Sequence, residues 1–299
     1  MFDVILSRKS IFKFLFLVSI PLLSNCSLSR HDQAPHQHTA EGSPIRFLLT
    51  FDDGPSGARD SNPTEKIRDT LASNGVQSNI KAIFFVQTRA VRGGGTEVGQ
   101  ILLRRLHGDG HLLAFHSATT HHDNHRFLSA VELENSLQLG IADLKKITGA
   151  APMLVRPPYW SYSKDTLSRY DHHGLHMLLT DLSANDGKIH GVNWSWHKRS
   201  NLYRQLQRVN GEIENGTLGA VDGAIPIVVT FHDVNPYTAR NLEVYLHILV
   251  DIAKELNLPL AEKPFYDERA QLEKAALARA VSDQAVDSYI PGFWGWWWK

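Results

Sequence analysis

Two adjacent carboxylates, Asp52 and Asp53, stand where a short apolar stretch at residues 45–49 runs into a Gly-Pro turn. Like charges this close repel each other, so the pair is costly as structure alone. Successive side chains of a strand point to opposite sides. One carboxylate can therefore bind a metal ion while its neighbour stays free to accept a proton. The pattern predicts a reactive site at the carboxyl end of a buried strand.

Polar groups follow most of the other apolar stretches in the same way. They are His116, His121, His122 and His125 after residues 111–115, Arg156, Tyr159 and Trp160 at the end of residues 153–156, Asp181 and Asp186 after residues 175–180, and His232 and Asp233 after residues 225–231. The stretch at residues 81–87 is followed by no comparable group. A carboxylate and two imidazoles can hold a divalent metal with open positions, while a second carboxylate and a separate histidine supply base and acid. These residue types predict metal-assisted hydrolysis of an amide or ester.

The elements that must position these groups alternate along the chain. Strands are expected at residues 45–51, 81–87, 111–115, 153–156, 175–180 and 225–231, with a short seventh at residues 259–261. The clearest helix covers residues 129–148, where Ser129 and Glu132 form a capping box and Gly149 ends the helix. Repeated strand–helix units predict an α/β fold with a parallel sheet or barrel, whose active site lies at the carboxyl ends of the strands.

The order of these motifs resembles the polysaccharide deacetylases of carbohydrate esterase family four, the NodB-type fold, over about residues 45–260. The hexapeptide Thr-Phe-Asp-Asp-Gly-Pro at residues 50–55 matches the first motif of that family. Residues 110–117 are similar to its second motif, and Arg-Pro-Pro-Tyr at residues 156–159 to its third. The resemblance implies a single catalytic domain, a distorted (β/α) barrel of about seven parallel strands.

The resemblance also implies a role for each matching residue. Asp52 is the expected base, His232 the acid, Arg156 the residue that orients Asp52, Asp181 the partner of Arg156, Asp53 and His116 the metal ligands, and Tyr159 and Trp160 the substrate and oxyanion contacts, the first through its backbone amide. The fourth motif of the family normally contains a tryptophan that residues 181–186 lack. The chain is therefore expected to be a divergent member.

The second metal histidine is displaced. The family places it four residues after the first, where this chain has Thr120. Counting back from the helix that follows favours His122, whereas the smallest insertion after His116 favours His121. We take His121 as the expected ligand and His122 as the alternative. Zn²⁺ is the expected metal, with Co²⁺, Ni²⁺ or Mn²⁺ as alternatives.

The activity that the resemblance implies is removal of N-acetyl groups from amino sugars of a cell-envelope or secreted polysaccharide, peptidoglycan or a chitin-like polymer. One alternative is an O-acetyl polysaccharide esterase with the same residues, and another is an inactive glycan-binding lipoprotein. The formal charge is zero, with 31 basic and 31 acidic residues, so no bulk field favours nucleic acid.

The N-terminus predicts export. A basic start precedes an apolar run at residues 14–23, which is short for a membrane span. The run ends near Cys26, the single cysteine, so residues 1–26 resemble a lipoprotein signal whose cysteine is lipidated. The protein is then expected to be anchored to a membrane, facing the periplasm or the cell surface. Residues 27–44 are expected to form a flexible linker.

The two ends of the catalytic domain are expected near residues 45 and 262. A C-terminal helix from residue 267 to about residue 288 and a tail with four tryptophans follow at residues 263–299. The tryptophans suit sugar stacking or a membrane interface, and they equally suit an apolar groove at the bottom of the barrel.

Overall fold

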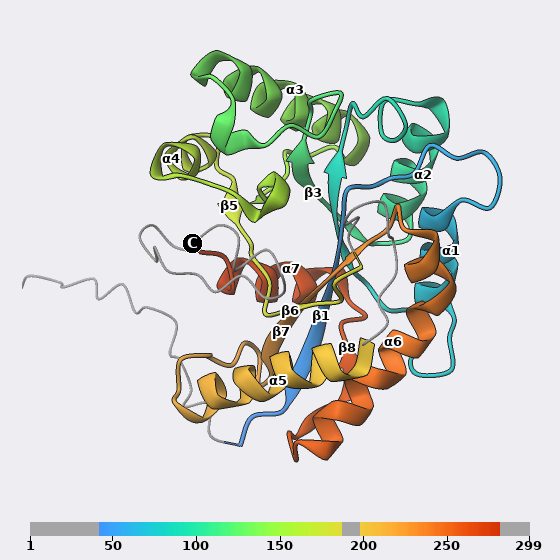
Figure 1. Ribbon diagram of the computed structural model, residues 1–299, viewed down its shortest axis with the longest axis vertical. Coiled ribbons are helices and arrows are strands. Elements are labelled where there is room, and N and C mark those ends of the chain that lie inside the picture. Colours follow the sequence, from blue (N-terminus) through green and yellow to red (C-terminus); the bar gives the residue numbers. More distant parts are fainter. Residues whose placement is uncertain (1–41, 187–197, 282–299) are drawn as a thin grey trace, which may run out of the picture. The chain divides into compact units, whose positions relative to one another are not determined.

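The computed structural model describes residues 42–186 and 198–281, which contain one curled parallel sheet (Figure 1). Its strands are β1 (Ile45–Asp52), β2 (Ile83–Gln87), β3 (Leu112–Ser117), β4 (Leu154–Val155), β5 (His176–Met177), β6 (Leu182–Ser183), β7 (Ile225–His232) and β8 (Leu260–Phe265). Seven of them follow the order β5-β4-β3-β2-β1-β7-β6, and β8 pairs with β1. The predicted distorted (β/α) barrel is confirmed.

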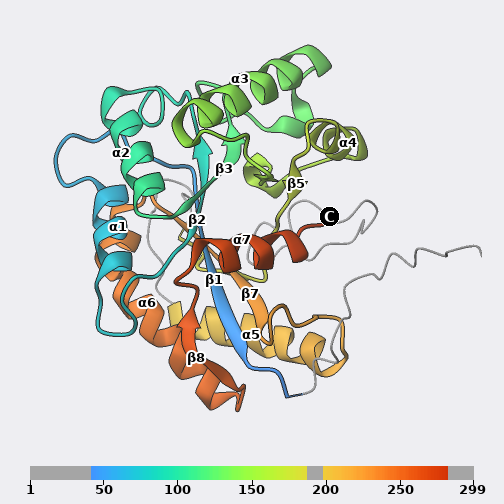
Figure 2. The same cartoon turned by 180° about the vertical axis from the view of Figure 1, so that it is seen from behind.

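Helices connect these strands; the first six cover the outside of the sheet, and the last packs against its inner face. They are α1 (Pro63–Ala72), α2 (Glu97–Gly108), α3 (Ala130–Thr148), α4 (Lys164–His172), α5 (Lys198–Glu214), α6 (Pro236–Glu255) and α7 (Arg269–Ala278), with short 3₁₀ turns η1 (His125–Phe127) and η2 (Pro158–Trp160). In both views α1 and α6 lie side by side (Figures 1 and 2). The predicted caps of α3 are present, because Ser129 and Glu132 form the capping box and Gly149 has a φ of 82°.

Three strands, β2, β4 and β5, are shorter than predicted, and β6 was not predicted. β4 and β5 have two residues each, and β6 follows β5 after a short irregular segment at residues 178–181. The carbonyls of Leu178 and Leu179 in this segment accept hydrogen bonds from the Arg156 side chain. The backbone is irregular here, and not a continuous strand, because these carbonyls bind the buried guanidinium of Arg156.

The alternation of side chains along the strands separates two cores. In β1, Phe47, Leu49 and Phe51 pack outward against the helices, while Leu48 belongs to the inner core. Helix α7 adds Leu272 to the same inner core. Both faces of β1 are buried, as expected for a parallel strand covered by helices.

Three predicted segments lie outside the described residues: the export signal with Cys26, most of the linker, and the tryptophan-rich tail. The described part of the predicted C-terminal helix is α7. No helix of the described residues combines the length and the apolarity that crossing a membrane requires.

Candidate active site

The inner face of the sheet ends in polar residues at the carboxyl ends of five strands. They are Asp52 of β1, Gln87 of β2, His116 of β3, Arg156 directly after β4, and His232 of β7. In the parallel register, Asp52 lies opposite His232 on β7. The strands therefore deliver apolar side chains to the barrel interior and functional groups to its rim.

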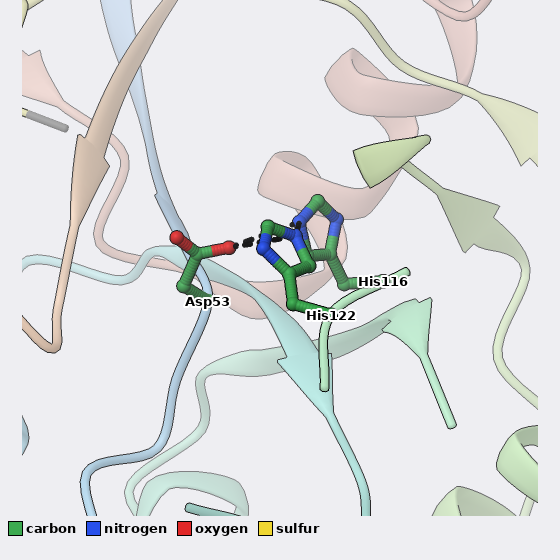
Figure 3. Close-up of side chains that lie close together, drawn as sticks. All are labelled: Asp53, His116 and His122. Atoms are coloured by element: carbon green, nitrogen blue, oxygen red, sulfur yellow. Dashed lines mark hydrogen bonds and ion pairs between the residues drawn. The ribbon is translucent and has the colours of Figure 1, made fainter. Parts of the chain in front are cut away.

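Asp53, His116 and His122 converge on one point (Figure 3). The Nε2 atoms of both histidines lie 3.2 Å from Oδ1 of Asp53. The two Nε2 atoms are 3.1 Å apart. Asp53 has a φ of 74°, a left-handed conformation that turns the chain directly after β1. A carboxylate oxygen and two imidazole nitrogens this close form a donor set for a divalent first-row metal.

The structure brings His122 into the cluster in place of His121, the ligand that we expected. His121 is exposed and does not belong to the cluster, whereas His122 does. His122 has a φ of 57°, so the inserted loop takes a left-handed turn at the ligand itself. The insertion after His116 thus extends the loop by two residues relative to Thr120, and His122 occupies the site.

The charge states of the cluster fit a metal. Burial would raise the pKa of Asp53, but His122, His116 and His232 hold it well below its usual range. Burial lowers the pKa of His122, which keeps the imidazole neutral and leaves the lone pair of one ring nitrogen available to a metal. Nδ1 of His116 donates to the Arg156 carbonyl at 2.7 Å, which leaves Nε2 of His116 as the acceptor facing Asp53.

Asp52 is held by a buried arginine. Nη1 of Arg156 donates to Oδ1 of Asp52 at 2.8 Å, and both side chains are buried. The same Nη1 also donates to Thr50 and Thr230, which lie opposite each other on β1 and β7. Oδ1 of Asp52 is thereby fixed, while Oδ2 has a long contact of 3.4 Å from the Trp160 indole N–H. The predicted contact of Arg156 with Asp52 is present.

Asp181 does not contact Arg156 as predicted. Its Oδ2 accepts from the Val228 backbone at 2.8 Å, and its Oδ1 accepts from Arg279 at 2.6 Å. The guanidinium of Arg156 is satisfied instead by backbone carbonyls and by the hydroxyls beside Asp52. Asp181 therefore links the segment between β5 and β6 to Arg279 at the end of α7. Arg279 lies beyond the residues that the resemblance covers.

Asp186 is the carboxylate that orients His232. Its Oδ1 accepts from Nδ1 of His232 at 2.8 Å, and its Oδ2 accepts from the His232 backbone at 3.0 Å. Burial would lower the pKa of His232, but neighbouring carboxylates, Asp186 foremost, raise it to about 10. Nε2 of His232 lies 4.0 Å from Oδ2 of Asp53, so a protonated imidazole faces the cluster.

Tyr159 and Trp160, the predicted substrate and oxyanion contacts, both lie in the turn η2 at the rim of the barrel. The Tyr159 ring stacks on His122 with centroids 4.7 Å apart. Trp160 is largely buried and reaches Asp52. The segment from Arg156 to Trp160 thus contacts Asp52 and both histidines of the cluster.

Three further residues join the site without a predicted role. Gln87 donates to Oδ1 of Asp53 at 3.2 Å. The alternation of side chains along β2 could have revealed it, because Gln87 lies two residues after the inward-facing Phe85 and so shares its face. Asp186 had been noted only as a polar residue after a strand. Asp233 is fully buried beneath Gly54, and burial, foremost, raises its pKa to about 7.

Comparison with known proteins agrees with the motif order. Residues 40–178 match the family model described as polysaccharide deacetylase. A chitin deacetylase from Pestalotiopsis sp is 31% identical over 153 residues, which cover 50% of this chain and 45% of the relative. A peptidoglycan-N-acetylglucosamine deacetylase from Listeria monocytogenes is 29% identical over 231 residues, which cover 77% of this chain and 40% of the relative. The chain spans less than half the length of these relatives.

A solved structure shares the fold. The chitin deacetylase from Colletotrichum lindemuthianum matches with a TM-score of 0.51 and 24% identity, over 74% of this chain and 86% of that chain. At this identity the likeness concerns the fold alone. The family model places residues 40–178 in the polysaccharide deacetylase family, and the identity of about 30% to these relatives makes the chain a divergent member.

Proposed function

We propose that the protein is a metal-dependent hydrolase that removes N-acetyl groups from amino sugars of a cell-envelope or secreted polysaccharide. The observation that carries this proposal is the convergence of Asp53, His116 and His122 beside Asp52 and His232. A divalent metal, Zn²⁺ in our proposal, would polarise the acetyl carbonyl and acidify the attacking water when bound by that cluster.

Asp52 is suited to accept the proton of the attacking water. Arg156 occupies its Oδ1, so Oδ2 is the oxygen that remains for proton transfer. The buried ion pair keeps the carboxylate in one orientation, because a change of rotamer would leave a buried guanidinium without its partner. The Tyr159 backbone amide is the proposed donor to the oxyanion, as the resemblance implies.

His232 is suited to protonate the departing amine. Asp186 holds Nδ1, which directs Nε2 toward the cluster. A pKa of about 10 keeps His232 protonated at neutral pH before substrate arrives. An amine is a poor leaving group unless it is protonated, so an imidazolium at this position serves amide hydrolysis.

Acetate release from defined substrates tests the proposal. Purified protein loaded with Zn²⁺ should release acetate from chitin oligomers or peptidoglycan, and Asp52→Asn should abolish the release while retaining the metal. Release from acetylated xylan but from neither amino-sugar polymer would favour an O-acetyl esterase. Retained glycan binding without release from any substrate would favour a binding protein and contradict the proposal.

We also propose that the chain is exported and anchored through lipidated Cys26. The support is the basic and apolar order of residues 8–23 before the single cysteine. Wild-type protein should partition into the detergent phase of a two-phase extraction, and Cys26→Ser should not. Equal partition of both would contradict lipidation at this residue.

A further inference from the structure

The two imidazoles of the cluster are held in different ways. His116 stands on β3, and its Nδ1 donates to the Arg156 carbonyl at 2.7 Å. His122 stands in the loop after β3, and no hydrogen bond to its Nδ1 is found among residues 42–186 and 198–281. A metal-ligating histidine normally uses its second nitrogen in such a bond, which fixes the ring orientation. Another contact must orient His122.

The ring of Tyr159 supplies the contact that the geometry requires. It stacks on the His122 imidazole with centroids 4.7 Å apart and planes 25° apart. Within the part of the chain that the structure describes, the imidazole has one other ring neighbour, His116 of β3, at 5.1 Å and 36°. Tyr159 belongs to the segment whose Arg156 carbonyl fixes His116. The segment from Arg156 to Tyr159 therefore contacts both histidines and fixes the orientation of both rings.

The backbone of this turn is strained. Tyr159 has φ 59° and ψ 13°, and Trp160 has φ 55°, so two consecutive aromatic residues adopt the left-handed conformation that favours glycine. Tyr159 is 41% exposed, so the turn buries its side chain only in part. Strain of this kind clusters at active sites and ligand-binding segments.

We propose that Tyr159 is the positioning residue for His122. The strained turn places the ring against the imidazole and restricts it to the orientation in which Nε2 faces Asp53 and His116. The aromatic ring carries this role, since the contact involves no hydrogen bond to the phenol. The inference rests on the proposed function only in requiring that the cluster bind a divalent metal.

The affinity of the metal-stripped full chain for Zn²⁺, measured by competition with a chromophoric chelator, tests this role without any substrate. Tyr159→Phe should bind Zn²⁺ as the wild type does. Tyr159→Ala and Tyr159→Gly should bind about 10- to 100-fold more weakly, the usual effect of losing an outer contact of a ligand. Phe127→Ala removes another exposed ring near this loop and should leave the affinity unchanged.

Thermal unfolding of the metal-free variants separates positioning from a merely structural role. Tyr159→Gly should unfold at the wild-type temperature or higher, because glycine relieves the strained φ. Weaker Zn²⁺ binding together with unchanged or higher stability supports the proposal. Wild-type affinity in Tyr159→Gly, or a loss of affinity that follows a loss of stability, overturns it. Wild-type protein that binds no Zn²⁺ contradicts the proposed function, and this inference with it.

Discussion

Replacing His111 by Asn should make the folded protein less sensitive to acid. His111 lies directly before β3 and is 2% exposed, and its Nδ1 accepts the Ala82 backbone N–H at 3.1 Å. Its ring meets Phe84 edge-on, with centroids 5.3 Å apart. Burial, with a contribution from Lys81, lowers the pKa of His111 to about 4. The native protein therefore holds this histidine neutral.

The size of the effect follows from the difference between the folded and unfolded states. In the unfolded chain His111 has its ordinary pKa of about 6.5. Between pH 6.5 and 4 the unfolded chain binds more protons than the folded protein, so the free energy of unfolding falls as the pH falls. A pKa lowered from 6.5 to about 4 corresponds to a loss of about 3 kcal/mol over that range.

Urea unfolding of wild-type protein and His111→Asn at several pH values from neutral to about 4 measures this loss. Asn can still accept from Ala82, although the lost ring contact should make the variant less stable at neutral pH. The deficit should shrink by about 3 kcal/mol on acidification. His172→Asn, at an exposed histidine, should keep a constant difference from wild type. A His111→Asn deficit that stays constant with pH would refute the reasoning.

Two more substitutions test packing and pairing around the site. Gly54→Ala would place a Cβ 1.9 Å from Oδ2 of Asp233, so urea unfolding should show a loss of about 1–3 kcal/mol that largely disappears in an Asp233→Ala background. An equal loss in both backgrounds would show that the clash lies elsewhere. Arg279→Met removes the partner of Oδ1 of Asp181 and should lower the free energy of unfolding by about 1–3 kcal/mol. Full additivity with Asp181→Asn would contradict a direct pairing.

The fold was largely predictable because strand and helix signals are local. The apolar stretch that became β1 and the capping box at Ser129 depend on nearest neighbours in sequence. β6 was missed because it has two residues, and its neighbouring backbone is shaped by the distant side chain of Arg156. A one-dimensional pattern carries no signal for such a contact.

The candidate site was predictable where a residue that can bind a metal or transfer a proton lies at the carboxyl end of a strand. Asp52, His116 and His232 satisfy that condition, and the structure brings them to one rim. The choice between His121 and His122 depends on a left-handed turn inside an inserted loop, which spacing alone does not determine. The pairing of Asp181 depends on a residue almost a hundred positions away, so no local motif could reveal it.

The central claim is that a metal held by Asp53, His116 and His122 supports glycan deacetylation. His121→Ala and His122→Ala, compared side by side for bound Zn²⁺ and for acetate release from chitin oligomers, test it most directly. We predict that His121→Ala retains both metal and release, while His122→Ala loses both. Loss of metal and release in His121→Ala, with His122→Ala unaffected, would contradict the site described here.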